Sequence, residues 1–233
     1  MARALRFRFS RDERLKYIAH LDVLRLFERA IKRAGLPVAY TQGFNPRQKI
    51  VFGLPIAVGL TSSAEYADIE FDEEMTPESF ISRINQSLPE GIEVMEAVPV
   101  RNMGRIMSLI ASARYEIAFT IPQAMDQDTL SGIVIDFLDQ EDITVMKKTK
   151  KGMRPVNIRP LIYSLSVRKP DGDGYIMEAF LSAGAENNLR PDLLMQAFAQ
   201  KTGLELTVES IHRRAMFASD FNEWKSPLEV ADD

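Results

Sequence analysis

The sequence contains no cysteine and only two histidines, His20 and His212. Without cysteine thiols the chain cannot form a disulfide, use a thiolate nucleophile, or hold zinc or an iron–sulfur cluster through sulfur. Two histidines are too few for a histidine-rich metal site. The Walker A loop, the G-x-G-x-x-G motif and the G-x-S-x-G elbow are also missing. We therefore expect neither a metal nor a cofactor.

Long apolar runs are missing as well. No run approaches the roughly 20 residues of a membrane-spanning helix. Residues 1–9 alternate charged and apolar side chains where a secretion signal has a continuous apolar stretch. With 233 residues, 45% of them hydrophobic, the chain can form one large domain or two small ones. We expect a globular, cytoplasmic protein that does not contact a membrane.

The formal net charge is only −4, but the charges are sorted into blocks along the chain. Residues 1–50 contain 12 lysines and arginines against 4 acids, and residues 143–170 contain 8 against none. Residues 51–100 contain 10 acids and 1 base. Because screening limits electrostatic attraction to a Debye length of about 8 Å, a polyanion responds to local charge rather than to the total. The basic blocks predict RNA or another phosphate-rich partner.

Each half of the chain shows the same succession of hydrophobic patterns. The first half predicts strand 3–9, a helix beginning near residue 21, strands 38–41, 50–52 and 66–71, helix 77–88 and strand 92–98. The second predicts strand 115–121, helix 127–138, strand 143–146, a hairpin of 163–167 and 175–181, helix 190–201 and strand 206–217. Both halves read β-α-β-β-α-β with additional hairpin length.

This order predicts an α+β protein of two tandem ferredoxin-like (split βαβ) domains with extra β-hairpins. The expected N-terminal domain comprises residues 1–100, and the expected C-terminal domain comprises residues 101–218. Residues 219–233 form an acidic tail that either docks or stays mobile.

In both halves, positive charge gathers in the connection after the second strand. Glycine and proline restrict the path of these loops, an exposed phenylalanine can stack on a base, and arginine can bind phosphate through two hydrogen bonds. Equivalent loops of tandem domains can also line one cleft. The predicted RNA-binding residues are Phe44, Arg47, Lys49, Lys150, Lys151, Arg154 and Arg159. The alternative interpretation is that both loops are flexible, solvated hairpin tips.

His20 stands just before a predicted helix, near Tyr17 and Asp22. A histidine with a near-neutral pKa beside arginine and lysine can remove a 2′-hydroxyl proton in metal-independent RNA cleavage. A lone histidine at a helix start can equally be a capping or packing residue. His20 is therefore the candidate base if the protein is an enzyme, and catalytic residues are otherwise unknown.

Three acids occupy alternate positions near the strand predicted at residues 66–71. They are Asp68, Glu70 and Asp72. Strand alternation places them on one side of the sheet. We expect them to form a solvent-facing edge rather than a metal site.

Several runs resemble one known family. They are KYIAHLD at 16–22, LFERA at 26–30, AGLP at 34–37, QGFNPR at 42–47, AEYAD at 64–68, NIRPLI at 157–162 and NLRPD at 188–192. These runs resemble the radical-SAM-linked conserved family of unknown function, over nearly the whole chain to about Phe217. Gln48 is a small departure, at a position where proline or lysine is common in that family.

The resemblance implies a partner. Members are similar in being encoded beside, or fused to, a radical SAM enzyme with a cobalamin-binding domain, which would carry the cluster that this cysteine-free chain cannot hold. It therefore implies an accessory protein rather than an enzyme. The order of elements also resembles that of CRISPR repeat-processing endoribonucleases, which hold RNA with tandem ferredoxin-like domains.

The sequence thus leads to one expected function and two alternatives. We expect an RNA-binding accessory protein that presents an RNA substrate to a partner radical SAM enzyme. The first alternative is a metal-independent endoribonuclease with His20 as base. The second is a protein–protein docking platform without RNA, whose basic loops bind an acidic surface of the partner enzyme.

Overall fold

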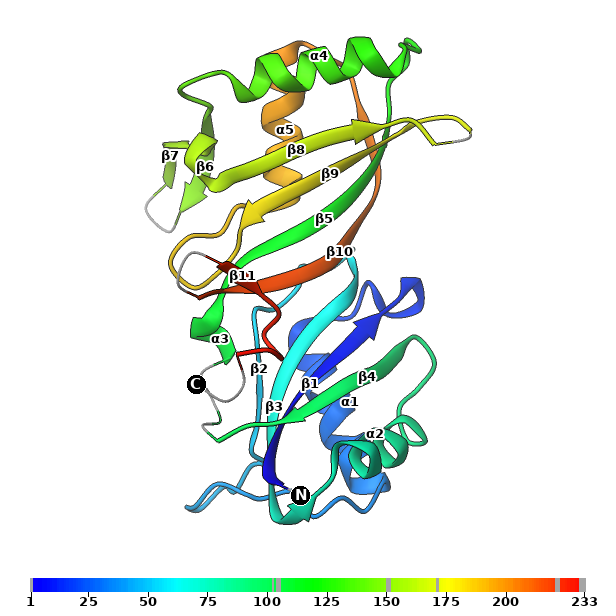
Figure 1. Cartoon of the computed structure of the whole chain (residues 1–233), viewed down its shortest axis with the longest axis vertical. Coiled ribbons are helices and arrows are strands. Elements are labelled where there is room, and N and C mark those ends of the chain that lie inside the picture. The colour runs from blue at the N-terminus through cyan, green and yellow to red at the C-terminus, as the bar shows by residue number, and fades with distance from the viewer. Residues whose placement is uncertain are drawn as a thin grey trace. The chain divides into compact units, whose positions relative to one another are not determined.

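Figure 1 shows the computed structural model, which describes every residue except 1, 102, 104, 105, 150, 151, 171, 221, 222 and 231–233. For residues 2, 147–149 and 220 it describes the backbone alone. Strands and a few helices form a mixed α+β fold, as the sequence predicts. The chain divides into two compact units: unit 1 comprises Met1–Ala111 and Arg213–Asp233, and unit 2 comprises Ser112–His212.

The chain passes between the units inside two strands, β5 (Ile110–Thr120) and β10 (Thr207–Asp220). That residues 1–100 and 101–218 are separate domains, with residues 219–233 as a tail, stays a prediction. Limited proteolysis would check these boundaries.

Unit 1 is built on three long strands that pair antiparallel. Its elements are β1 (Ala2–Arg11), η1 (Glu13–Leu15), α1 (His20–Arg33), β2 (Ile50–Phe52), β3 (Thr61–Met75), α2 (Pro77–Asn85), β4 (Ile92–Pro99), α3 (Ile106–Leu109) and β11 (Glu223–Lys225). β1 lies between β3 and β4, and β2 pairs with β3. In this register Arg6 of β1 lies opposite Asp68 of β3.

The two long helices of unit 1 cover one face of this sheet (Figure 1). Val23, Phe27 and Ile31 recur every four residues in α1 and are buried, which makes this side of the helix its core face. α1 ends before Gly35, whose φ of 59° lies in the left-handed region that glycine tolerates. Phe7 of β1 packs on Phe80 of α2, with the ring centres 5.2 Å apart.

The opposite face of the unit 1 sheet is covered by the C-terminal segment, residues 223–230. Pro227 and Val230 are buried, and the carbonyl of Pro227 accepts a hydrogen bond of 2.9 Å from Arg6 Nη1. Arg6 and Asp68 are consequently buried beneath this segment, 2.7 Å apart. The expectation that Asp68 belongs to a solvent-facing edge was wrong, because strand alternation cannot show that a distant segment covers the second face.

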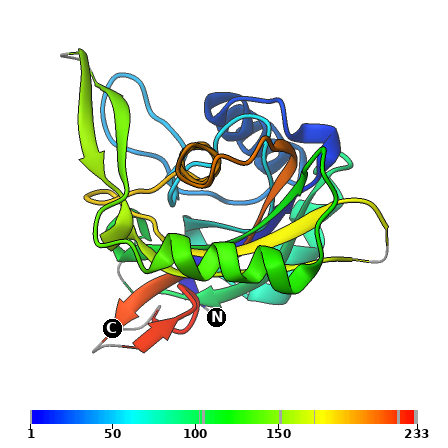
Figure 2. The same ribbon diagram turned by 90° about the horizontal axis from the view of Figure 1, so that it is seen from above.

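Unit 2 has the strand order β10-β5-β9-β8. Its further elements are α4 (Gln127–Leu138), β6 (Thr144–Thr149), β7 (Gly152–Asn157), η2 (Arg159–Leu161), β8 (Ile162–Arg168), β9 (Tyr175–Ser182) and α5 (Pro191–Thr202). α4 and α5 pack through Phe137 and Phe198, whose ring centres are 5.2 Å apart. β6 and β7 form a separate two-stranded hairpin, which Figure 2 shows standing away from the rest of unit 2.

The assignment of both units to the ferredoxin-like fold stays a prediction. Among the helices that the structure describes, none is long and apolar enough to cross a membrane.

Candidate functional site

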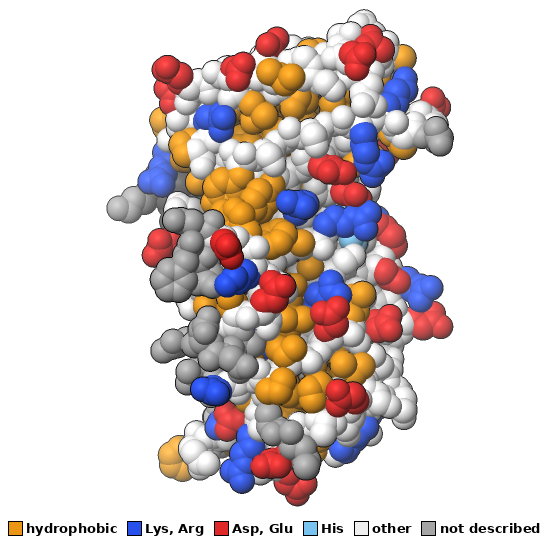
Figure 3. Space-filling view, in the orientation of Figure 1, with side chains coloured by type: hydrophobic (Ala, Val, Ile, Leu, Met, Phe, Trp, Pro, Cys, Tyr) orange, Lys and Arg blue, Asp and Glu red, His pale blue; other side chains and the backbone are white. Residues whose placement is uncertain are grey.

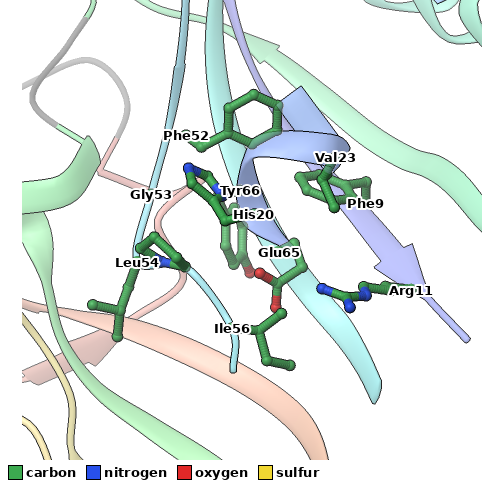
Figure 4. A pocket seen from close by; sticks show the side chains of 11 residues that line it. Phe9, Arg11, His20, Val23, Phe52, Gly53, Leu54, Ile56, Glu65 and Tyr66 are labelled. Carbon is green, nitrogen blue, oxygen red and sulfur yellow. The ribbon is translucent and has the colours of Figure 1, made fainter. Parts of the chain in front are cut away.

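A small pocket in unit 1 brings together polar residues from separate parts of the chain (Figure 4). Its polar lining consists of Arg11 from the end of β1, His20 from the start of α1 and Glu65 from β3. Its apolar walls include Phe9, Val23, Phe52, Leu54, Pro55 and Ile56. The cavity volume is about 20 Å³, enough for a single water-sized group.

Arg11 holds the segment that leads into α1. Its Nε donates to the carbonyl of Leu15 at 2.9 Å, and its Nη2 donates to the carbonyls of Lys16 and Ile18 at 2.8 and 2.6 Å. These bonds fix the path of residues 15–18, and this path places His20 at the pocket.

His20 is the first residue of α1, and the N-cap position belongs to Ala19, which makes no side-chain capping bond. The imidazole packs edge-on against Phe52, with the ring centres 5.6 Å apart. Neither ring nitrogen hydrogen-bonds to a residue in the described ranges. His20 is thus packed on one side, and both of its nitrogens are available to a ligand.

Glu65 is 6% exposed and is held by Arg213, which is 1% exposed. Arg213 Nε donates to Glu65 Oε1 at 3.0 Å, and its Nη2 donates to the same oxygen. Nη2 also donates to the carbonyl of Leu54 at 3.1 Å. Arg213 therefore connects β10 to β3 and to the loop that closes the pocket.

Burial lowers the pKa of the His20 imidazole below its ordinary value of 6.5. The negative charge of Glu65 opposes this shift, and the positive charge of Arg11 adds to it. Burial likewise lowers the pKa of Arg11, where Glu65 acts against the shift and Arg213 with it. Near neutral pH the pocket therefore presents a neutral imidazole beside a carboxylate, which can accept a proton or recognise a ligand by hydrogen bonding.

Within the parts of the chain that are described, no group of three or more histidines and acids could hold a metal ion.

The first predicted RNA-binding loop lies on unit 1. Phe44 at its tip is 105% exposed and Arg47 is exposed. Lys49 is half-buried, and its Nζ lies 2.8 Å from Glu70 Oε1. The loop therefore offers an aromatic ring and one arginine, while the charge of Lys49 is already paired.

The second predicted RNA-binding group lies around the β6–β7 hairpin. Lys150 and Lys151 fall outside the described residues. Arg154 is exposed on β7, opposite Lys147. Arg159 donates from Nε to the carbonyl of Leu138 at 2.6 Å and from Nη1 to that of Ile162 at 3.1 Å, so it joins α4 to β8. That these two loops line one cleft stays a prediction.

Sequence reasoning missed three of the charged residues around the pocket: Arg11, Glu65 and Arg213. The alternation of apolar residues along the strands contained a signal for these residues. Glu65 lies in phase with Ala67, Ile69 and Phe71, which face the core, and Arg11 lies in phase with Phe7 and Phe9. A charged residue on the apolar side of a strand predicts a buried, compensated group. Arg213 likewise lies in phase with Ile211, Ala215 and Phe217 in the sequence.

Part of the first basic block of the sequence is paired with the acidic block that follows it. Antiparallel pairing of β1 with β3 and β4 brings the two blocks together, and the ion pairs are Arg6–Asp68, Arg8–Glu96, Arg14–Glu90 and Lys49–Glu70. Figure 3 shows lysines and arginines intermixed with acids across the visible face. Residues 143–170, which include the β6–β7 hairpin, contain no acid, and Arg154 makes no ion pair with a described residue.

A family model matches residues 4–191, which is most of the chain. The chain belongs to the family described as "Uncharacterized protein conserved in bacteria (DUF2344)". The DUF2344 match contains most of β1, the whole of α1 and β3, and every residue of the predicted basic loops. Its description names no link to radical SAM enzymes. No curated protein matches the sequence.

Two solved structures resemble this DUF2344 protein in part. One is a chain in the crystal structure of a Cbf5-Nop10-Gar1 complex, with a TM-score of 0.49 and 10% identity, covering 92% of this chain and 50% of that one. The other is a chain in the archaeal box H/ACA sRNP Nop10-Cbf5 complex, with a TM-score of 0.49 and 10% identity, covering 90% and 46%. The protein thus spans about half the length of each. At this level of similarity neither carries a functional argument.

Proposed function

We propose that this protein binds RNA through the β6–β7 hairpin and presents it to a partner enzyme. The hairpin is the observation that carries the proposal. It stands away from the body of unit 2 (Figure 2) and lies in a stretch, residues 143–170, with 8 basic residues and no acid.

The register of the hairpin supports an anionic ligand. Lys147 lies directly opposite Arg154, and Lys148 lies opposite Met153. Like charges at directly opposed positions destabilise a β-ribbon. A phosphate chain lying along the ribbon would remove this repulsion and release counterions.

The proposed partner is a radical SAM enzyme with a cobalamin-binding domain, which rests on the family resemblance. Two features of the chain support an accessory role. It has no cysteine to hold an iron–sulfur cluster, and no described group of residues could bind a metal. We further propose that the complex is cytoplasmic and that both units are ferredoxin-like. The supporting observation for the fold is the strand order, β4-β1-β3 with β2 on β3 in unit 1 and β10-β5-β9-β8 in unit 2.

Replacing three hairpin charges tests the proposal. K147Q/K148Q/R154Q should weaken binding of labelled single-stranded RNA, measured by fluorescence anisotropy at several salt concentrations. For single-stranded RNA, the slope of log affinity against log salt should fall by about 0.7 for each phosphate that the variant no longer neutralises. R25Q/R29Q/K32Q removes the same number of charges from α1, where all three side chains are exposed, and should leave binding unchanged. Equal losses in both variants would contradict the hairpin as the binding site.

A protein-docking role has its own supporting observation. Met146 and Met153 on the hairpin are 53% and 58% exposed, and exposed methionines are adaptable contacts at protein interfaces. M146Q/M153Q should reduce co-purification of the partner enzyme after nuclease treatment if the hairpin binds protein. The endoribonuclease alternative, with His20 as base, stays a prediction.

A further inference from the structure

In the pocket at the start of α1, only one of the two carboxylate oxygens of Glu65 accepts hydrogen bonds from described residues. Two buried arginine–carboxylate pairs involve β3, and they differ in geometry. Arg6 donates from Nε to Asp68 Oδ1 at 2.7 Å and from Nη2 to Oδ2 at 3.1 Å, so both oxygens of Asp68 are occupied. Arg213 directs both of its bonds at Oε1 of Glu65. Glu65 Oε2 accepts no hydrogen bond from any residue that the structure describes.

The second available group in the pocket is the imidazole of His20. Figure 4 shows the ring close to Phe52, in the same pocket that Glu65 lines. A neutral imidazole carries one donor nitrogen and one acceptor nitrogen. Glu65 and His20 therefore offer a carboxylate acceptor and an N–H donor in the lining of one pocket.

The charges around the pocket exclude two ligand classes. Arg11 and Arg213 outnumber Glu65, so a cationic ammonium group is repelled. The arginine N–H groups described above are directed at carbonyls and at Glu65, and Glu65 faces the cavity. A phosphate would meet this carboxylate and does not fit a cavity of about 20 Å³. The pocket therefore suits an uncharged group that donates a hydrogen bond.

The cavity admits one amino or hydroxyl group, so the rest of a ligand must lie at its mouth. The lining there is apolar: Pro55 is exposed and Leu54 is half-buried. Gly59 N donates to the carbonyl of Lys16 at 2.7 Å, which joins the loop carrying Leu54 and Pro55 to the segment before α1. Tyr17, which follows Lys16, and Val58, which precedes Gly59, are both exposed. A flat ring with one polar edge fits a polar cavity whose mouth is apolar.

We propose that this pocket binds the amino-bearing edge of adenine or cytosine. Both bases carry an exocyclic amino donor beside a ring-nitrogen acceptor, which complements Glu65 Oε2 and the N–H of His20. The base comes either from a free nucleoside or from an RNA strand. This inference is independent of RNA binding by the hairpin.

Matched nucleosides test the pattern of donors and acceptors. Adenosine and inosine differ in having an amino or a carbonyl group at the same ring position, as do cytidine and uridine. Calorimetric titration of the full-length protein should show adenosine and cytidine binding about 5- to 150-fold more tightly than inosine and uridine. The NMR signals of the His20 ring should shift with adenosine, and those of His212 should not. Equal affinities within each pair would overturn the inference.

Glu65→Gln distinguishes recognition from a structural role. The amide oxygen must face Arg213 to accept its bonds, which turns the amide NH₂ toward the cavity. E65Q should therefore reverse the preference, from adenosine to inosine. Glu70→Gln makes the same change on β3 outside the pocket and should leave the preference intact. If E65Q does not fold, His20→Phe should still weaken adenosine binding at least 5-fold, and an unchanged affinity in that variant would overturn the inference.

RNA strands separate the two sources of the base. Strands of adenosine, cytidine or uridine are compared in wild type, E65Q and the hairpin variant. If the nucleosides do not bind but the adenosine and cytidine strands bind through Glu65, the base comes from RNA. If no nucleoside binds and no strand depends on Glu65, the pocket inference fails. Loss of strand binding in the hairpin variant alone would still support the proposed function.

Discussion

Arg6 and Arg213 are nearly inaccessible to solvent, and each is compensated by a carboxylate on β3. A buried ion pair of this kind contributes little net stability compared with an apolar pair, but removing one partner leaves a charge uncompensated. We therefore expect the chain to tolerate substitution least at these arginines and at their carboxylate partners.

Asp68→Ala should lower the free energy of unfolding by about 3–5 kcal/mol, because it leaves the Arg6 guanidinium buried without its counter-ion. Urea unfolding measures this directly. Glu96→Ala removes the partner of Arg8 at the surface, where the carboxylate is 55% exposed, and should cost about 1 kcal/mol or less. Similar costs for the two variants would contradict the structural role of the buried pair.

The histidine in the pocket should make stability depend on pH. Burial is the main cause of the lowered pKa of His20. Between pH 6.5 and the lower folded-state pKa, the unfolded chain is protonated at this residue while the folded chain is not. The stability from neutral His20 is therefore complete above pH 6.5 and is lost as the pH falls through that interval. In His20→Gln, the free energy of unfolding measured in urea should decline less steeply with falling pH than in wild type, and a decline as steep as that of wild type would contradict this role of His20.

At the level of elements, local signals predicted several boundaries well. The helix predicted at residues 127–138 is α4, Gln127–Leu138, where Asp126 accepts a hydrogen bond of 2.8 Å from Thr129 N. The hairpin predicted at residues 163–167 and 175–181 corresponds to β8 and β9. Capping residues and turn residues act within a few positions of themselves, so a single sequence shows them.

Other elements depend on distant contacts. Residues 38–41 form isolated bridges instead of a strand, and β3 extends well beyond the predicted residues 66–71 at both ends. The strand predicted at 143–146 is the first arm of a hairpin whose second arm, β7, contains Pro155. Pairing partners decide where a strand ends, and local alternation does not identify them.

The N-cap of α2 gives a test at this scale. The Thr76 hydroxyl accepts a hydrogen bond of 3.2 Å from Ser79 N, and Pro77 follows at the first helical position. Thr76→Ala should lower the free energy of unfolding by about 1 kcal/mol, since it removes this capping bond. Thr76→Ser keeps the hydroxyl and should be nearly neutral. A urea series on both variants checks the difference.

For unit 1 as a whole, the N-terminal strand and the C-terminal segment stabilise each other. The C-terminal segment covers the sheet face that holds Arg6 and Asp68, and Tyr66 Oη lies 3.5 Å from Ser226 Oγ. This segment therefore packs on the sheet of unit 1, the unit to which residues 213–233 belong.

A chain that ends at Ser219 should be less stable by about 2–4 kcal/mol. It loses the charge-assisted bond from Arg6 to Pro227 and the burial of Val230. Backbone amide hydrogen exchange in β1 and β3 should also be faster in this shorter chain than in the full-length chain. A chain ending at Val230 keeps these interactions and is the control. Unchanged exchange in the shorter chain would show that the segment does not stabilise the sheet.

The sequence by itself determined the α+β class, most helix boundaries, the exclusion of cysteine chemistry and the concentration of basic residues at 143–170, because these follow from composition and from patterns over a few residues. Only the tertiary structure decided which charges remain uncompensated and which groups meet in a pocket. Glu65, Arg11 and Arg213 lie far apart in the chain, and antiparallel pairing together with the returning β10 brings them to His20. Burial and charge compensation depend on contacts between distant segments, and no local pattern records which segments those are.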